Sequence, residues 1–201
     1  MGMIHKYKVI FIRIPKTAST SIYSCFKNKT DKKCSHETYK YNLCINDFDL
    51  FFDYFSFSCV RNPYDRFVSI YKIDEKINQI RKIRNEVYTF DNLIFKLYNK
   101  KLNIDDLGVM YKEQHKYICI NDTILVDKLL KYENLNEDWL DFSNIINNLP
   151  NNKYKISTQL PMENVNHNKP YDDWKDYYTD ETKNMIYEIY KKDFEIFGYE
   201  K

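Results

Sequence analysis

The sequence predicts one α/β domain spanning residues 1–201, in which helices flank a mostly parallel sheet. Residues 7–14 form a β-branched and aromatic run that ends at Pro15, and helical spacing begins at Thr20 after a short loop. Residues 55–60 form a second predicted strand, which Asn62-Pro63 separates from another helical pattern. Because a strand, a loop and a helix follow one another twice, a parallel sheet covered by helices is the simplest architecture. A chain of 201 residues is long enough for one such core.

The rest of the chain predicts further helices and one hairpin. Residues 28–37 are polar and predict a surface loop that ends near a short helix at residues 39–43. Helical spacing recurs over residues 89–98, 135–149 and 179–197, and the last of these helices should stop at Gly198. Residues 117–120 and 124–126 predict a hairpin around Asn121-Asp122, followed by a strand at residues 129–132.

Composition narrows the possible partners. Lysine and arginine total 31 against 29 acidic residues, so the net charge of +2 gives no reason to expect binding to nucleic acid. No apolar run reaches the roughly 18 residues that a membrane span needs, and residues 1–14 lack the pattern of a secretory signal. We therefore expect a soluble, cytoplasmic protein. Its five cysteines form an odd set without zinc-ligand spacing, which predicts reduced thiols and no metal site.

The first candidate site lies between the first predicted strand and its helix. Backbone N–H groups at a helix N-terminus have no partner within the helix and attract anions. The loop adds the ammonium of Lys16 and several hydroxyl groups, so it has the chemistry of a phosphate site. It comprises Pro15, Lys16, Thr17, Ala18, Ser19, Thr20 and Ser21. The spacing of a Walker loop is absent, and a helix capped by Ser or Thr beside an exposed lysine is the alternative interpretation.

The second candidate site follows the second predicted strand. Arg61 ends that strand and Ser69 lies eight residues further on, about two turns into the next helix. A guanidinium group suits bidentate phosphate binding, and open α/β sheets bind ligands at the carboxyl ends of their strands. For Arg66 we expect instead an ion pair with Asp65 or a neighbouring carboxylate on a solvated face.

Together the two segments resemble the donor-binding motifs of the Golgi-type carbohydrate sulfotransferases and their relatives. Residues 15–21 resemble the 5′-phosphosulfate loop, and residues 59–69 resemble the 3′-phosphate motif. The Ala18-Ser19-Thr20-Ser21 form of the loop is most similar to the uronyl and heparan 2-O-sulfotransferase branch. Weaker similarity extends to residues 132–135 and 177–199.

The resemblance implies a P-loop-like three-layer fold and the donor 3′-phosphoadenosine 5′-phosphosulfate (PAPS), which leaves as 3′-phosphoadenosine 5′-phosphate (PAP). It implies that Lys16 contacts the bridging oxygen of the donor and that residues 17–21 hold its 5′-phosphate. It also implies that Arg61 and Ser69 hold the 3′-phosphate and that the acceptor is a hydroxyl, with a carbohydrate favoured. A sulfuryl group carries less negative charge than a phosphoryl group, so we expect no metal.

A catalytic base is also needed to take the proton of the acceptor. His36 lies between the two motifs, where the base histidine of the family stands, and Glu37 is the reserve candidate. His5 precedes the first strand at its far end, and His115 has no predicted place. Two other functions stay open: a nucleotide kinase or NTPase of related topology, and a catalytically silent relative that binds a nucleotide or glycan.

Overall fold

The computed structural model describes residues 2–26, 53–81, 88–150, 153–161 and 173–201, and only the backbone of residues 74–81. Contacts divide the chain into two compact units. The first unit comprises Met1–Arg61 and Gln114–His167, and the second comprises Asn62–Glu113 and Asn168–Lys201. The single domain over residues 1–201 stays a prediction.

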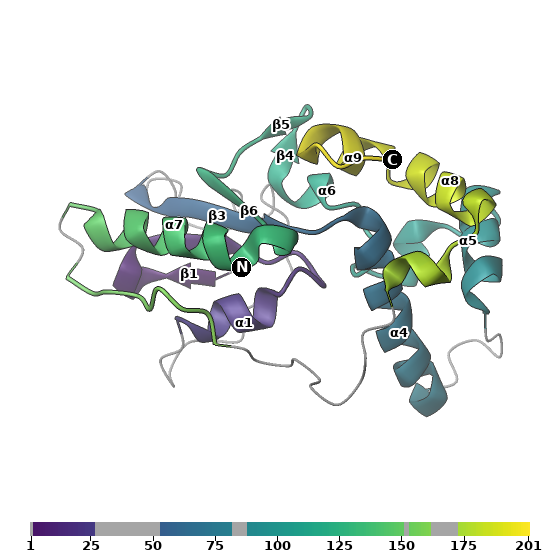
Figure 1. The fold of residues 1–201 in the computed structure, drawn as a ribbon, viewed down its shortest axis with the longest axis horizontal. Helices are drawn as coiled ribbons and strands as arrows, with labels where there is room; N and C mark the ends of the chain where they lie inside the picture. The colour runs from purple at the N-terminus through teal and green to yellow at the C-terminus, as the bar shows by residue number, and fades with distance from the viewer. Residues whose placement is uncertain (1, 27–52, 82–87, 151–152, 162–172) are drawn as a thin grey trace. The chain divides into compact units, whose positions relative to one another are not determined.

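The first unit is built on a four-stranded sheet in the order β1-β2-β3-β6 (Figure 1). Its strands are β1 (Gly2–Ile4), β2 (Val9–Ile12), β3 (Phe55–Val60) and β6 (Lys128–Lys131). β2, β3 and β6 run parallel, whereas β1 pairs antiparallel with β2. The predicted fold class, a mixed α/β fold with a mostly parallel sheet between helices, is confirmed.

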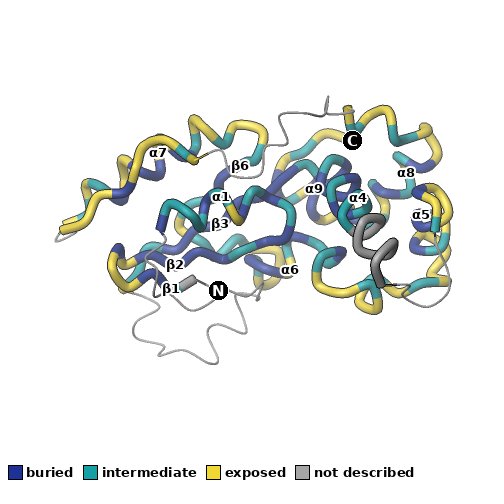
Figure 2. Tube along the Cα trace, turned by 90° about the horizontal axis from the view of Figure 1, so that it is seen from below, coloured by how far each residue is buried: buried dark blue, intermediate teal, exposed yellow. Residues whose placement is uncertain are grey.

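Alternate residues of β2 and β3 form the core of this unit on one face of the sheet. The register pairs Phe11 with Phe57, and their rings stack with centroids 4.6 Å apart. Helices α1 (Ser19–Ser24) and α7 (Leu135–Asn148) cover this face with apolar side chains such as Ile22 and Phe142. Figure 2 shows α1 and α7 on one side of the strands and the single turn α6 (His115–Ile118) on the other.

The second unit consists mainly of helices around an aromatic core. Its helices are α4 (Pro63–Arg81), α5 (Phe90–Tyr98), α8 (Asp180–Ile189) and α9 (Lys191–Phe197), with short 3-10 turns η3 (Ile104–Leu107) and η5 (Trp174–Tyr177). Tyr64 on α4 stacks against Trp174, and the Tyr178 hydroxyl donates to the Tyr64 carbonyl over 2.9 Å. Trp174 in this unit and the fully buried Trp139 on α7 thus both serve in packing.

Several sequence predictions are confirmed and several need correction. The strand at residues 55–60 and the helices at residues 89–98 and 135–149 are present. The hairpin is also present, as β4 (Cys119–Ile120) and β5 (Thr123–Ile124), but residues 117–118 belong to α6. The prediction of a single helix over residues 179–197 is wrong. The helical region is interrupted at Tyr190, which separates α8 from α9, and Gly198 ends α9. The short helix at residues 39–43 lies outside the described residues.

Two further expectations are corrected. The antiparallel edge strand β1 was not predicted, and Tyr7 belongs to the 3-10 turn η1 (His5–Tyr7) instead of the first strand. Arg66 does not lie on a solvated face, since it is 1% exposed. Its Nη2 donates to the Met110 carbonyl over 2.7 Å, so helix packing within the second unit encloses this guanidinium.

Candidate functional site

The loop after β2 leads into α1 through two left-handed residues. Lys16 has φ 69° and Ala18 has φ 57°, and neither is a glycine. Thr17 between them is fully buried, and its hydroxyl donates to the Ile14 carbonyl over 3.0 Å. This bond fixes the turn from within, so that the loop keeps its shape although residues 13–21 contain no glycine.

The first turn of α1 has the composition of an anion site. It holds no acidic residue, and no side chain caps the helix at Ala18. Ser19 is buried and Thr20 is exposed, whereas the Ala18 carbonyl accepts the N–H of Ile22 as the first helical bond. The first turn of α1 therefore supplies no negative charge of its own to the positive end of the helix.

Arg61 lies directly beyond the last residue of β3 and is 7% exposed. Its guanidinium carbon lies 4.0 Å from the centroid of the Tyr132 ring, which is cation–π distance. Its Nη1 donates to the Lys16 carbonyl over 3.2 Å. The guanidinium group of Arg61 therefore contacts the loop that carries Lys16.

Strand topology explains why these residues meet. β2, β3 and β6 are parallel neighbours, so their carboxyl ends lie at one edge of the sheet. Val60 pairs with Lys131, which sets the next residues, Arg61 and Tyr132, side by side. The structure thus brings Lys16, the loop at residues 17–21 and Arg61 to the same edge, as expected for an α/β ligand site.

Sequence reasoning assigned no role to two residues at this edge, Gln114 and Tyr132. Gln114 is fully buried and makes two hydrogen bonds with the backbone of Arg61. Tyr132 lies beneath the Arg61 guanidinium. The register from a predicted strand at residues 129–132 could have indicated Tyr132, whereas no local pattern marks Gln114.

The remaining predicted site residues are not all placed at this edge. Ser69 lies half-buried on α4 in the second unit. His36 and Glu37 lie outside the described residues. His5 lies in η1 before β2, where its Nδ1 is 2.9 Å from the Tyr54 hydroxyl, as expected for the far end of the strand. His115 is half-buried in α6, next to Gln114.

Cys59 lies in β3, two residues before Arg61, and is fully buried. Burial raises the pKa of its thiol well above the ordinary value of 9.0, and the negative charges of Glu133 and Asp138 raise it further. The raised pKa favours the neutral thiol, and Cys59 packs in the core cluster of the first unit.

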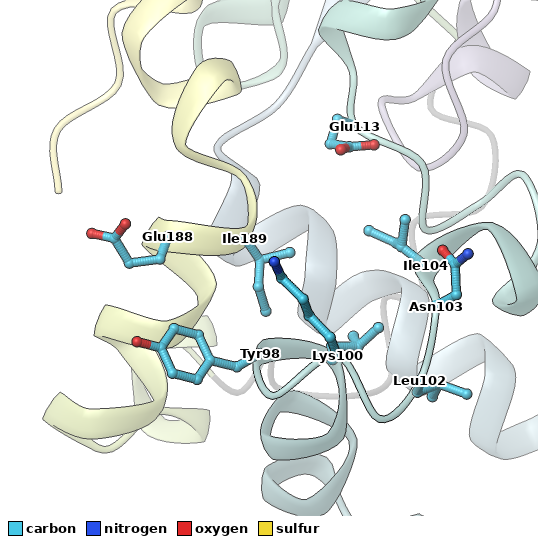
Figure 3. A pocket seen from close by; sticks show the side chains of 9 residues that line it. Tyr98, Lys100, Leu102, Asn103, Ile104, Glu113, Glu188 and Ile189 are labelled. Atoms are coloured by element: carbon cyan, nitrogen blue, oxygen red, sulfur yellow. The ribbon is translucent and has the colours of Figure 1, made fainter.

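A hollow of about 600 Å³ lies within the second unit (Figure 3). Its lining includes Lys100, Glu113 and Glu188 beside apolar residues such as Ile104 and Ile189. Figure 3 shows the Lys100 side chain reaching toward Ile189, with Glu113 on the opposite side of the hollow. None of the residues predicted to bind the donor lines it.

Within the described ranges, no group of three or more His, Cys, Asp or Glu side chains could hold a metal ion. Over the same part of the chain, no helix is long and apolar enough to cross a membrane.

The family model described as the sulfotransferase family matches residues 2–200. The chain belongs to the sulfotransferase family. No curated protein matches it, and no solved structure does. The match covers both strand ends described above.

Proposed function

We propose that this sulfotransferase moves a sulfuryl group from PAPS to a hydroxyl of a carbohydrate. The observation that carries the proposal is the hydrogen bond between the Arg61 guanidinium and the Lys16 carbonyl. This bond joins the Arg61 side chain to the backbone of Lys16, and it supports the proposal that these two cationic residues from adjacent strand ends share one nucleotide. The donor carries phosphates on the 3′ and the 5′ oxygens of one ribose, and two neighbouring cationic residues suit such a pair of groups.

The chemistry of the surrounding groups fits this donor. α1 presents a helix N-terminus without acidic side chains, which suits the 5′-phosphate. The planar guanidinium of Arg61 suits the 3′-phosphate, because it can donate two parallel hydrogen bonds. PAPS, when bound, supplies the sulfuryl group and a phosphate leaving group. Ser69 is proposed as a second donor to the 3′-phosphate, in keeping with the motif that it ends.

In this proposal Lys16 supplies positive charge where negative charge develops on the leaving side. A preorganised charge of this kind lowers the barrier more than it strengthens binding of the ground state. His36 accepts the proton of the acceptor hydroxyl, and Glu37 is the alternative base. No metal is required by this set of roles.

The proposal is tested by supplying radiolabelled PAPS with a panel of carbohydrates, alcohols and tyrosine peptides. We expect label to be transferred to a carbohydrate hydroxyl, without added divalent metal. Label that reaches only peptides or simple alcohols would contradict the carbohydrate assignment. Binding of PAP without transfer to any acceptor would support a silent relative, and magnesium-dependent ATP turnover would support a kinase or NTPase.

The base is assigned by comparing His36→Asn with Glu37→Gln. We expect His36→Asn to lower kcat by about 100-fold or more and to remove the acidic limb of the pH–rate profile. Glu37→Gln should leave that limb in place. The reverse result would make Glu37 the base.

A further inference from the structure

A side chain from a distant part of the chain holds the backbone of Arg61. β3 ends at Val60, so the N–H and carbonyl of Arg61 lie beyond its ladder. The Arg61 N–H donates to Oε1 of Gln114 over 3.0 Å, and Nε2 of Gln114 donates to the Arg61 carbonyl over 2.8 Å. An amide side chain carries both a donor and an acceptor, so Gln114 satisfies both groups at a fully buried position.

The side chain of Arg61 is held separately. Tyr132 supports the plane of the guanidinium, with the ring centroid 4.0 Å from its central carbon. The Lys16 carbonyl accepts from Nη1 at one edge of the same group. Because Arg61 is only 7% exposed, these contacts leave its guanidinium little freedom to rotate. Its orientation is therefore set before any ligand arrives.

We infer that Gln114 and Tyr132 are positioning residues that orient Arg61 and thereby set the preference of the site for a 3′-phosphorylated nucleotide. The inference rests on the proposed function, in which Arg61 binds the 3′-phosphate. Gln114 fixes the backbone from which the Arg61 side chain extends, and Tyr132 fixes the plane of the Arg61 guanidinium. A guanidinium that is oriented in advance loses less conformational freedom when it binds a phosphate. It should therefore strengthen binding of the nucleotide that carries a 3′-phosphate and leave binding of the nucleotide without it unchanged.

The test compares two nucleotides that differ by one group, PAP and adenosine 5′-phosphate, by isothermal titration calorimetry. The ratio of their dissociation constants measures discrimination of the 3′-phosphate. We expect Tyr132→Leu to lower this ratio by about 5- to 30-fold, the effect of losing one desolvated cation–π contact, with binding of adenosine 5′-phosphate unchanged. Tyr132→Phe keeps the ring and should keep the ratio.

Gln114→Glu is the second arm. It keeps the size and the acceptor of Gln114 but removes the N–H that donates to the Arg61 carbonyl. We expect the ratio to fall here as well, and Arg61→Ala should remove most of the preference for PAP.

The two proposals fail in different ways. If Arg61→Ala lowers the ratio while Tyr132→Leu and Gln114→Glu leave it unchanged, or weaken both nucleotides equally, the positioning roles are overturned and the proposed function stands. If the wild-type protein binds both nucleotides equally, or if Arg61→Ala leaves the ratio unchanged, the role of Arg61 in the proposed function is overturned and the inference falls with it.

Discussion

The chain is held differently where it leaves β2, at Lys16, and where it leaves β3, at Arg61. After β2, the backbone is shaped by left-handed residues and by the Thr17 hydroxyl, and the Lys16 side chain is half-exposed. After β3, the Arg61 side chain is buried against Tyr132 and its backbone is bound by Gln114. In the proposed function, Lys16 meets a charge that forms during the reaction, whereas the fixed guanidinium of Arg61 recognises a phosphate that does not change.

The largest effect on activity is expected from substitution of Lys16. We expect Lys16→Ala to lower kcat for sulfuryl transfer by about 100- to 1,000-fold, with a much smaller change in binding of PAP, because the charge acts mainly in the transition state. Initial rates with radiolabelled PAPS measure this.

Lys8→Ala is the matched control for that variant. Lys8 also has a positive φ, 52°, but it precedes β2 at the opposite end of the strand. Its substitution should leave kcat within about twofold, as expected for an exposed residue away from the site. Equal losses in the two variants would show that Lys16 acts through the fold and not through its charge.

A smaller effect is expected from the hydroxyl that shapes the lysine loop. Thr17→Val keeps the volume but removes the bond to the Ile14 carbonyl, so the free energy of unfolding should fall by about 1–2 kcal/mol. Thr20→Val, at an exposed position of α1, should cost less than about 0.5 kcal/mol. Urea unfolding of both variants checks this, and equal stabilities would mean that the Thr17 bond does not hold the loop.

The smallest predicted effect compares a cysteine in β3 with a cysteine at the C-terminal end of α1. Cys59 is buried in β3 with a raised pKa, whereas Cys25 is half-buried at the end of α1. Because the thiolate is the reactive form, iodoacetamide at about pH 8 should modify Cys25 well before Cys59. Peptide mapping by mass spectrometry gives the order. Faster modification of Cys59 would mean that the end of β3 opens more readily than its packing indicates.

The sequence predicted the elements whose patterns are local. Residues 55–60 alternate and end at a breaker, and the strand has those bounds. The break at Tyr190 has no local signal, since neither glycine nor proline stands there. At the break, the Tyr190 hydroxyl donates to the Tyr111 carbonyl over 2.8 Å, a contact between residues 79 positions apart that no local pattern predicts. β1 was missed because it is only three residues long and joins β2 through a 3-10 turn without a hairpin sequence.

The residues of the candidate site also fall into those that local sequence patterns predict and those that they do not. Lys16 and Arg61 follow predicted strands, so their approach could be expected from parallel pairing alone. Gln114 could not, because its role depends on a contact between residues 53 positions apart in the sequence. Arg66 was misjudged for a related reason, since its neighbour Asp65 suggested a surface pair, whereas the Met110 carbonyl lies 44 residues away.

The proposed function requires Lys16 and Arg61 to bind the 5′-phosphate and the 3′-phosphate of one nucleotide. A crystal structure with PAP tests it most directly. We expect the 5′-phosphate at the loop of residues 16–21 and the 3′-phosphate within hydrogen-bond distance of the Arg61 guanidinium. PAP bound away from either residue, or with its 3′-phosphate on other side chains, would contradict it.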